Sequence, residues 1–360
     1  GINGAGAARE AAGRGLKVLL VEQQDFAFGA SSRSTKLVHG GLRYLEHRDF
    51  HLVAEALKER RVLCEILAPH LTRTLPFLVP VYRGDQRPPW MIRAGLWLYD
   101  ALAWKGGGLI RAHRWLGPER VRALAPNLAT EGLRGAGEYW DCQMDDARVV
   151  LENLADARSL GAQTINYCSL ESVSRLKDGN VEALLRDREQ GGTTQVRARL
   201  LVLCTGAWTD RVFNTLGLRS PSPRVHATKG IHLATRRLLD SHALLVPARD
   251  GRVFFVIPWE LEGRPASLIG TTDTDFSGDP DHVRAEDDEI AYLLREATRV
   301  LPEEELSRGD VLATYAGLRP LNAPPVPGKK RGNNATSREH TFWEEPGVLS
   351  VTGGKFTTYR

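Results

Sequence analysis

The chain begins with glycines at positions 1, 4 and 6, and glycine is the residue type that a phosphate-binding turn requires. Such a turn lets the backbone approach a pyrophosphate, and the free N–H groups and dipole of the following helix favour its negative charge. A hydrophobic stretch at 16–21 then predicts a buried parallel strand that ends at Glu22. An acid about 20 residues after the turn is placed to bind a ribose. The spacing predicts a dinucleotide site for FAD or NAD, against the alternative of a plain helix–strand pair.

A second polar segment, residues 31–45, is too rich in hydrogen-bond donors for a buried core. It reads Ser-Ser-Arg-Ser-Thr-Lys-Leu-Val-His-Gly-Gly-Leu-Arg-Tyr-Leu. Its hydroxyls, glycine pair and cations suit a loop that lies along a flavin and its substrate. This segment therefore favours FAD over NAD.

The remaining pattern predicts the elements that must position these segments. Helical periodicity runs from 51 to 68, and 90–104 is a second helix rich in aromatic residues. Short alternating runs over 164–203 predict a β-meander, and 225–275 is again rich in strand-forming residues. A helix is expected at 287–300. This alternation is typical of a dinucleotide-binding domain interleaved with a second, sheet-rich domain.

Composition places the chain among globular proteins. Of its 360 residues, 42% are hydrophobic and 26% are charged, which excludes disorder, collagen-like repeats and a coiled coil. The 48 basic and 44 acidic residues give a net charge of +4, a balance that does not indicate a nucleic-acid partner. The four cysteines form no CxxC pair, so we expect buried thiols in a reducing compartment and neither a metal site nor a disulfide framework.

Further motifs carry a resemblance to a known family. They are Asp-Asp-Ala-Arg at 145–148, Thr-Gly-Ala-Trp at 205–208, Ile-Gly-Thr-Thr-Asp at 269–273, Gly-Leu-Arg-Pro at 317–320 and Gly-Gly-Lys-Phe-Thr-Thr-Tyr-Arg at 353–360. Over nearly its whole length the chain resembles the FAD-dependent, quinone-linked glycerol-3-phosphate dehydrogenases of the D-amino-acid-oxidase-like flavoprotein superfamily. The run His-Gly-Gly-Leu-Arg-Tyr-Leu at 39–45 is specific to the glycerol-phosphate branch.

The resemblance implies a mixed α/β fold. A Rossmann-like FAD-binding domain is expected over 1–75, 135–215 and 316–360, interleaved with an antiparallel-sheet substrate domain over 76–134 and 216–315. A first strand before the glycine turn and a C-terminal helical domain are expected to lie outside this sequence.

The resemblance also implies oxidation of sn-glycerol 3-phosphate to dihydroxyacetone phosphate, with a hydride passing from C2 to FAD. Binding the phosphate dianion requires cations, and guanidinium groups suit its oxygens. Arg43, Arg338 and Lys355 are the expected phosphate-binding residues, with Tyr44 assisting. Arg43 is also included among the catalytic candidates.

Two residues are expected near the C2 hydroxyl. Arg319 is ranked as catalytic, because an arginine stabilises a developing alkoxide better than it removes a proton. His232 has the natural pKa for a base, but a structural histidine is about equally plausible, so the proton acceptor stays open. The expected FAD-binding residues are Gly1, Asn3, Gly4, Glu22, Ser32, Ser34, Lys36, Leu37, His39, Gly40, Gly41, Gly206, Gly354, Lys355 and Thr357.

The resemblance implies a quinone as electron acceptor, peripheral attachment to the cytoplasmic face of the cell membrane, and a possible homodimer. Segment 90–105 has three tryptophans and a tyrosine flanked by cations, which suits a bilayer interface, although such a helix can equally pack its aromatic residues into the core. The alternatives are an oxidase that reduces O2, an amine or 2-hydroxy-acid oxidase, and a non-catalytic flavin-binding fragment.

Overall fold

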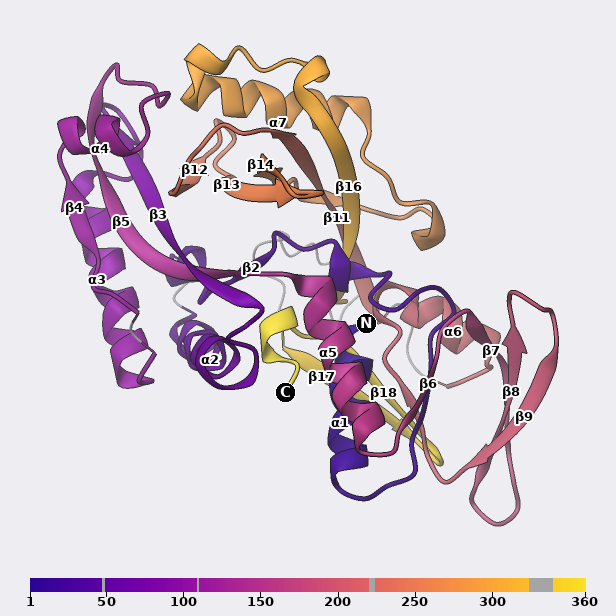
Figure 1. Cartoon of the computed structure of the whole chain (residues 1–360). Helices are drawn as coiled ribbons and strands as arrows, with labels where there is room; N and C mark the ends of the chain where they lie inside the picture. The colour runs from indigo at the N-terminus through magenta and orange to yellow at the C-terminus, as the bar shows by residue number, and fades with distance from the viewer. Residues whose placement is uncertain (47–48, 109, 220–223, 324–338) are drawn as a thin grey trace.

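The computed structural model describes residues 1–46, 49–108, 110–219, 224–323 and 339–360, without the side chain of Arg43. Its fold is mixed α/β, as predicted (Figure 1). The helices are α1 (Ile2–Gly13), α2 (Phe50–Arg61), α3 (Pro89–Lys105), α4 (Pro118–Leu124), α5 (Asp146–Ser159), α6 (Thr209–Thr215) and α7 (Asp287–Val300).

Two small sheets surround the glycine turn. Strand β1 (Leu19–Val21) pairs in parallel with β6 (Gln163–Ile165), and β10 (Leu201–Leu203) pairs in parallel with β18 (Val348–Gly353). Strand β17 (His340–Glu345) is antiparallel to β18. The predicted strand at 16–21 is thus confirmed in its second half. It is half-buried instead of buried, because β6 is its one partner among the described strands.

Helix α1 follows the glycine turn and packs along α5 (Figure 1). Its buried face consists of Ile2, Ala5, Ala8 and Ala12, and these small side chains allow close packing. Gly6 lies so near the C-terminal segment that an added Cβ would come within 2.6 Å of the Tyr359 ring. The two ends of the described chain therefore meet beside α1.

The largest sheet has ten described strands. Its order is β15-β11-β14-β13-β12-β3-β5-β2, with β16 paired to β11 and β4 to β5. The bounds are β2 (Leu37–Val38), β3 (Thr72–Tyr82), β4 (Arg114–Leu116), β5 (Leu133–Met144), β11 (Val225–Arg236), β12 (Ala243–Pro247), β13 (Val253–Leu261), β14 (Arg264–Gly270), β15 (Thr274–Asp275) and β16 (Val311–Asn322). Strands β5 and β16 run across the expected domain boundaries at 135 and 316, and the division into two domains stays a prediction.

Helices cover the large sheet, and a small sheet stands apart from it. Helix α3 packs on β5 and α2, and α7 packs on β11 and β14 (Figure 1). The predicted helix at 51–68 is confirmed as α2, which continues into a wider π-helical turn at Val62–Leu67. The meander predicted over 164–203 is confirmed over 168–198, as the antiparallel strands β7 (Cys168–Arg175), β8 (Val181–Asp187) and β9 (Thr193–Ala198). The residues at its two ends instead form β6 and β10, which pair in parallel with strands of other sheets.

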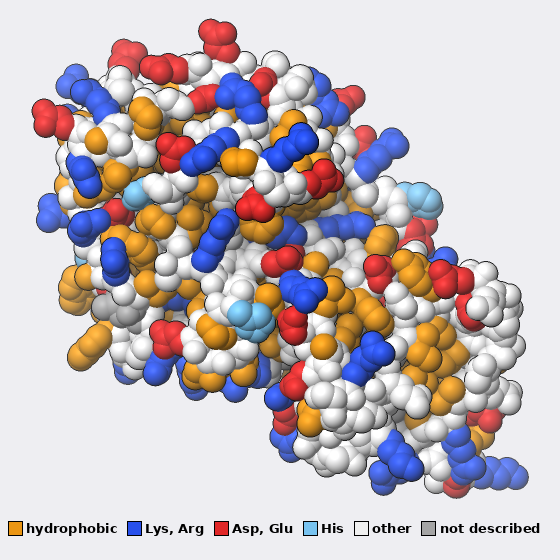
Figure 2. Space-filling view, viewed as in Figure 1, with side chains coloured by type: hydrophobic (Ala, Val, Ile, Leu, Met, Phe, Trp, Pro, Cys, Tyr) orange, Lys and Arg blue, Asp and Glu red, His pale blue; other side chains and the backbone are white. Residues whose placement is uncertain are grey.

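Surface charge is mixed. On the face seen in Figure 2, basic and acidic side chains are interspersed with hydrophobic ones. All four cysteines are free, and two of them, Cys142 and Cys168, are buried. No helix in the described part of the chain has the length and apolar character that a membrane span requires.

Candidate active site

The glycine turn lies at the carboxyl ends of β1 and β10. A Cβ added at Gly4 would contact Cys204 at 3.5 Å and Leu20 at 3.9 Å. The nitrogen of Gly1 lies 3.5 Å from Oε2 of Glu22, so the turn and the predicted ribose-binding acid are adjacent. This is the edge of a parallel sheet at which dinucleotides bind.

The start of α1 has the character of an anion site. Gly1, the N-cap residue of α1, has no side chain to bond the amides of Asn3 and Gly4, so these amides can meet a phosphate. The backbone N–H of Ile2 donates to Oγ of Ser31 at 2.9 Å. Ser31 is not among the residues expected at the cofactor, and the expected role of its neighbour Ser32 stays a prediction. The amides of Asn3 and Gly4 and the Ser31 hydroxyl are the groups here that fit the pyrophosphate of FAD.

A second glycine turn approaches the same helix end. Gly353 and Gly354 have φ values of 72° and 83°, a left-handed conformation that favours glycine. The carbonyl of Gly353 accepts from Asn3 Nδ2 at 3.5 Å. A Cβ at Gly354 would lie 2.0 Å from His340 Nε2, so a larger residue there would have to displace that imidazole. Asn3 and Gly354, both expected at the cofactor, are thus brought together, while the FAD-binding roles of Gly206 and Thr357 stay predictions.

Ser34 and Lys36 direct their polar atoms to a different partner. Lys36 Nζ lies 2.5 Å from Oδ1 of Asp146 and 2.6 Å from the carbonyl oxygen of Ser32. Ser34 Oγ donates to Oδ2 of Asp146 at 2.6 Å. Since the Asp146 side chain is fully buried at the start of α5, these contacts anchor the polar segment to that helix. The expected FAD-binding role of both residues stays a prediction.

A cavity of about 110 Å³ opens beside the polar segment. Of the residues predicted for the site, it is lined by Leu37, His39, Gly41, Tyr44 and Arg319. It is also lined by polar residues that were not named as site residues. Thr35, Thr271 and Asp273 lie in motifs quoted above, whereas Asp141 and Arg252 gave no signal in the sequence. Phe77, Tyr139 and Phe255 add aromatic walls. A cavity with aromatic walls and converging polar groups is a candidate site for a small, polar ligand.

Arg319, on β16, is fixed in position by oxygen acceptors. Its Nη1 donates to Oδ1 of Asp273 at 3.1 Å, and its Nη2 donates to Thr271 Oγ1 at 2.9 Å and to the Thr272 carbonyl at 3.0 Å. Gly230 makes room for the guanidinium, because a Cβ there would lie 2.3 Å from Nη2. The arrangement holds a positive charge at the cavity wall.

His232, on β11, lies behind the cavity wall. Its side chain is buried, stacked on Tyr315 with ring centroids 4.7 Å apart, and its Nε2 lies 2.9 Å from Oγ1 of the cavity-lining Thr35. Burial lowers the pKa of His232 well below its ordinary value, and the charges of Arg319 and Lys36 add to this effect. The imidazole is therefore neutral. Its link to the cavity is the hydrogen bond with the Thr35 hydroxyl, since Thr35 lines the cavity.

The remaining substrate-site predictions are only partly described. Lys355 Nζ lies 4.4 Å from the centre of the Tyr44 ring, which places this cation beside the cavity. Arg338 lies outside the described residues, as does the side chain of Arg43.

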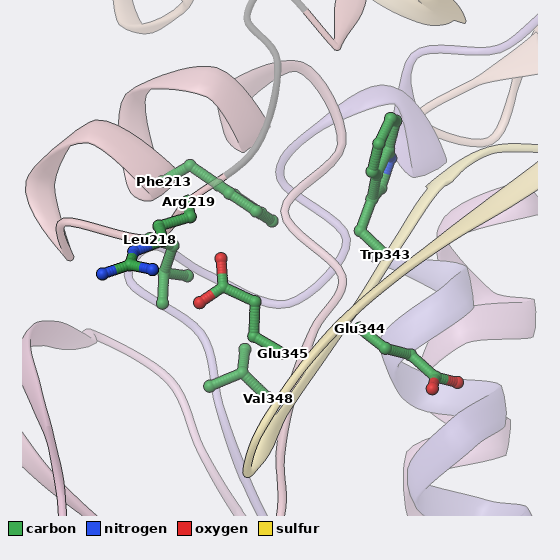
Figure 3. A pocket seen from close by; sticks show the side chains of 7 residues that line it. All are labelled: Phe213, Leu218, Arg219, Trp343, Glu344, Glu345 and Val348. Atoms are coloured by element: carbon green, nitrogen blue, oxygen red, sulfur yellow. The ribbon is translucent and has the colours of Figure 1, made fainter.

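A second cavity, of about 190 Å³, lies between the end of α6 and strands β17 and β18 (Figure 3). Glu345 points toward Leu218 and Arg219, whereas Glu344 points away. This second cavity is lined by none of the predicted site residues. Across the described ranges, no group of three or more His, Cys, Asp or Glu residues could hold a metal ion.

Comparison with known proteins identifies the family. The model of the FAD dependent oxidoreductase family (DAO) matches residues 1–360. Over its full length the chain is 40% identical to a glycerol-3-phosphate dehydrogenase of Synechocystis sp. and 40% identical to a D-erythritol 1-phosphate dehydrogenase of Brucella abortus, covering 66% and 70% of those proteins.

A solved structure agrees with these relatives. The glycerol-3-phosphate dehydrogenase of Bacillus halodurans complexed with FAD is 31% identical with a TM-score of 0.75, and the match covers all of this chain and 60% of that one. The chain thus spans roughly two thirds of the length of the relatives it matches. It belongs to the family of FAD-dependent oxidoreductases, and its cofactor is FAD.

Proposed function

We propose that this chain is the catalytic part of a glycerol-3-phosphate dehydrogenase that oxidises sn-glycerol 3-phosphate to dihydroxyacetone phosphate. The observation that carries the proposal is the guanidinium of Arg319 at the cavity wall, which Asp273, Thr271 and Thr272 hold in a fixed orientation. The names of the Synechocystis relative and of the Bacillus halodurans structure support the same substrate.

Bound FAD supplies the acceptor for the hydride that leaves C2. Arg319 stabilises the negative charge that develops on the C2 oxygen as the hydroxyl proton is lost. Tyr44 and Lys355 hold the phosphate end of the substrate, together with Arg43 and Arg338. Because burial and the charges of Arg319 and Lys36 depress its pKa, His232 is a weak proton acceptor, so we assign it the role of orienting the Thr35 hydroxyl at the cavity wall and leave the acceptor of the proton open.

Steady-state kinetics of the full-length, FAD-loaded protein with an artificial electron acceptor test the substrate. We expect kcat/KM for sn-glycerol 3-phosphate to exceed that for glycerol by at least about 100-fold, because glycerol lacks the phosphate group that the proposed binding residues would contact. D-Erythritol 1-phosphate is the second candidate, since a relative of equal identity carries that name. Equal rates with glycerol would contradict a phosphate site, and a preference for the four-carbon ester would reassign the substrate.

We further propose that a quinone accepts the electrons and that the protein attaches to the cytoplasmic face of the cell membrane. The supporting feature is α3, on which Trp90, Trp97 and Trp104 recur every seven residues with exposed fractions of 71%, 66% and 75%. Residues seven apart share a helix face, and exposed tryptophans suit the lipid headgroup region. Hydrogen peroxide formed in proportion to turnover would favour the oxidase alternative instead.

A further inference from the structure

A connected set of buried polar groups lies next to the cavity, and the proposed chemistry does not use it. Asp141, on β5, is 1% exposed and lines the cavity. The hydroxyl of Tyr99, on α3, lies 2.8 Å from each of its carboxylate oxygens. Nη1 of Arg60, on α2, donates to Oδ1 of Asp141 at 2.5 Å. Three separate elements thus place their polar atoms around one carboxylate.

The set continues to the loop that forms the cavity wall. The backbone N–H of Gly40 donates to the Tyr99 oxygen at 2.8 Å. Burial raises the pKa of Tyr99 well above its ordinary value, so the hydroxyl keeps its proton and donates it to Asp141. The hydrogen bonds therefore run in one direction, from Gly40 through Tyr99 to Asp141.

Packing fixes the loop at the same point. A Cβ added at Gly40 would lie 2.6 Å from Leu57 and 2.7 Å from the Tyr99 oxygen, so the backbone rests directly on α2 and α3. The neighbours of Gly40 in sequence, His39 and Gly41, line the cavity, as does Tyr44. A shift of Gly40 would consequently move that wall of the cavity.

Arg60 supplies the charge that lets this carboxylate stay buried. Its guanidinium also donates to the carbonyl of Trp140 at 3.1 Å and to that of Gly108 at 2.5 Å. Burial is the largest single effect and acts to lower the pKa of Arg60, but the charge and hydrogen bond of Asp141, together with Tyr99 and Cys142, outweigh it and hold the pKa above the ordinary value. Removing one member of such a pair strands a buried charge, so Arg60 and Asp141 are poor first choices for substitution.

We propose that Tyr99 and Asp141 are positioning residues for substrate binding, which hold Gly40 and thereby set the cavity wall formed by His39, Gly41 and Tyr44. Neither residue is assigned a chemical step. The inference rests on the proposed function, because the wall is taken to face the polyol phosphate.

Tyr99→Phe tests the proposal, because it removes the hydroxyl and keeps the ring. Tyr82→Phe is the matched control: Tyr82 also donates a hydrogen bond, to the Ala129 carbonyl at 3.1 Å, on the part of the large sheet away from Gly40. In the FAD-loaded full-length protein, we expect Tyr99→Phe to raise KM for sn-glycerol 3-phosphate about five- to tenfold, with kcat within about twofold. Tyr82→Phe is expected to leave KM unchanged even if its thermal midpoint falls.

Hydrogen–deuterium exchange supplies a readout that needs no substrate. Exchange in the peptide covering 38–46 should accelerate in Tyr99→Phe and not in Tyr82→Phe. Unchanged exchange in this peptide would overturn the positioning proposal, whether or not the wild-type protein oxidises the phosphate ester. Inactivity of the wild-type protein toward the phosphate ester would instead refute only the proposed function. Faster exchange with an unchanged KM in an active enzyme would overturn the positioning role.

Discussion

Arg319 combines a permanent charge with a planar fork whose orientation is set by Asp273, Thr271 and Thr272. The positive charge alone could be supplied by lysine, whereas the fork could not. A role in stabilising the alkoxide therefore predicts that geometry matters as well as charge at this position.

We expect Arg319→Lys to lower kcat by about 100-fold while FAD stays bound, because one oriented charge-assisted contact is lost in the transition state. Arg236→Lys is the control, since Arg236 is a half-exposed arginine that pairs with Glu304 and Asp310. The measurement is single-turnover reduction of the flavin. A rate within threefold of wild type would remove Arg319 from the mechanism.

His232 should make the folded protein sensitive to acid. Its pKa is depressed by burial in the folded state. As the pH falls below about 6.5, the unfolded chain therefore takes up a proton that the folded chain does not, and folding is destabilised by up to about 1.4 kcal/mol per pH unit. The thermal midpoint should fall more in wild type than in His232→Gln between about pH 7.5 and about pH 5.5. His51→Gln, at an exposed histidine, is the control and should keep the wild-type change of thermal midpoint with pH. The same change in His232→Gln would contradict the prediction.

At the scale of elements, helix α3 has two different faces. Leu96, Tyr99 and Ala103 are buried against the large sheet and α2, whereas Trp90 and Trp97 are exposed. The sequence left open whether the aromatic residues pack in the core or at an interface. The structure divides them, with the tyrosine inside and the tryptophans outside.

The exposed face leads to a prediction about vesicles. Trp97→Ser/Trp104→Ser should lower co-sedimentation with anionic phospholipid vesicles at least about tenfold, because tryptophan favours the headgroup region. Phe342→Ser, at an exposed phenylalanine on β17, is the control and should sediment like wild type. Equal sedimentation of the tryptophan variant would remove α3 from the membrane proposal, and a loss of dimer instead would assign the face to a second copy of the chain.

The sequence predicted elements better than contacts between them. The periodicity at 51–68 and the alternation at 164–203 are local, so a helix and a meander could be read directly. Asp141 gave no such signal. A carboxylate on a strand can be recognised as part of the site only when the fold has placed Arg60 and Tyr99 around it. The contact of Ser31 with the start of α1 could not be predicted for the same reason, since which hydroxyl meets the helix depends on how the loop is packed.

At the scale of the whole molecule, the cofactor side of the site is assembled from segments far apart in sequence. Gly1, Glu22 and Ser31 meet at the start of α1, and Gly353 joins them from the other end of the chain. The spacing of the glycines and the acid predicted the first part. The convergence of the C-terminal glycines followed from the family resemblance alone, because no periodicity links residues 350 positions apart.

The most direct test of the account is an anaerobic titration of the full-length, FAD-loaded protein, with the flavin band near ~450 nm followed as polyols are added. We predict loss of this band with sn-glycerol 3-phosphate and its persistence with glycerol. The reason is that the cations at the cavity are proposed to bind the phosphate group, which glycerol lacks. A band that persists with the phosphate ester, or that bleaches equally with glycerol, would contradict the proposed reaction.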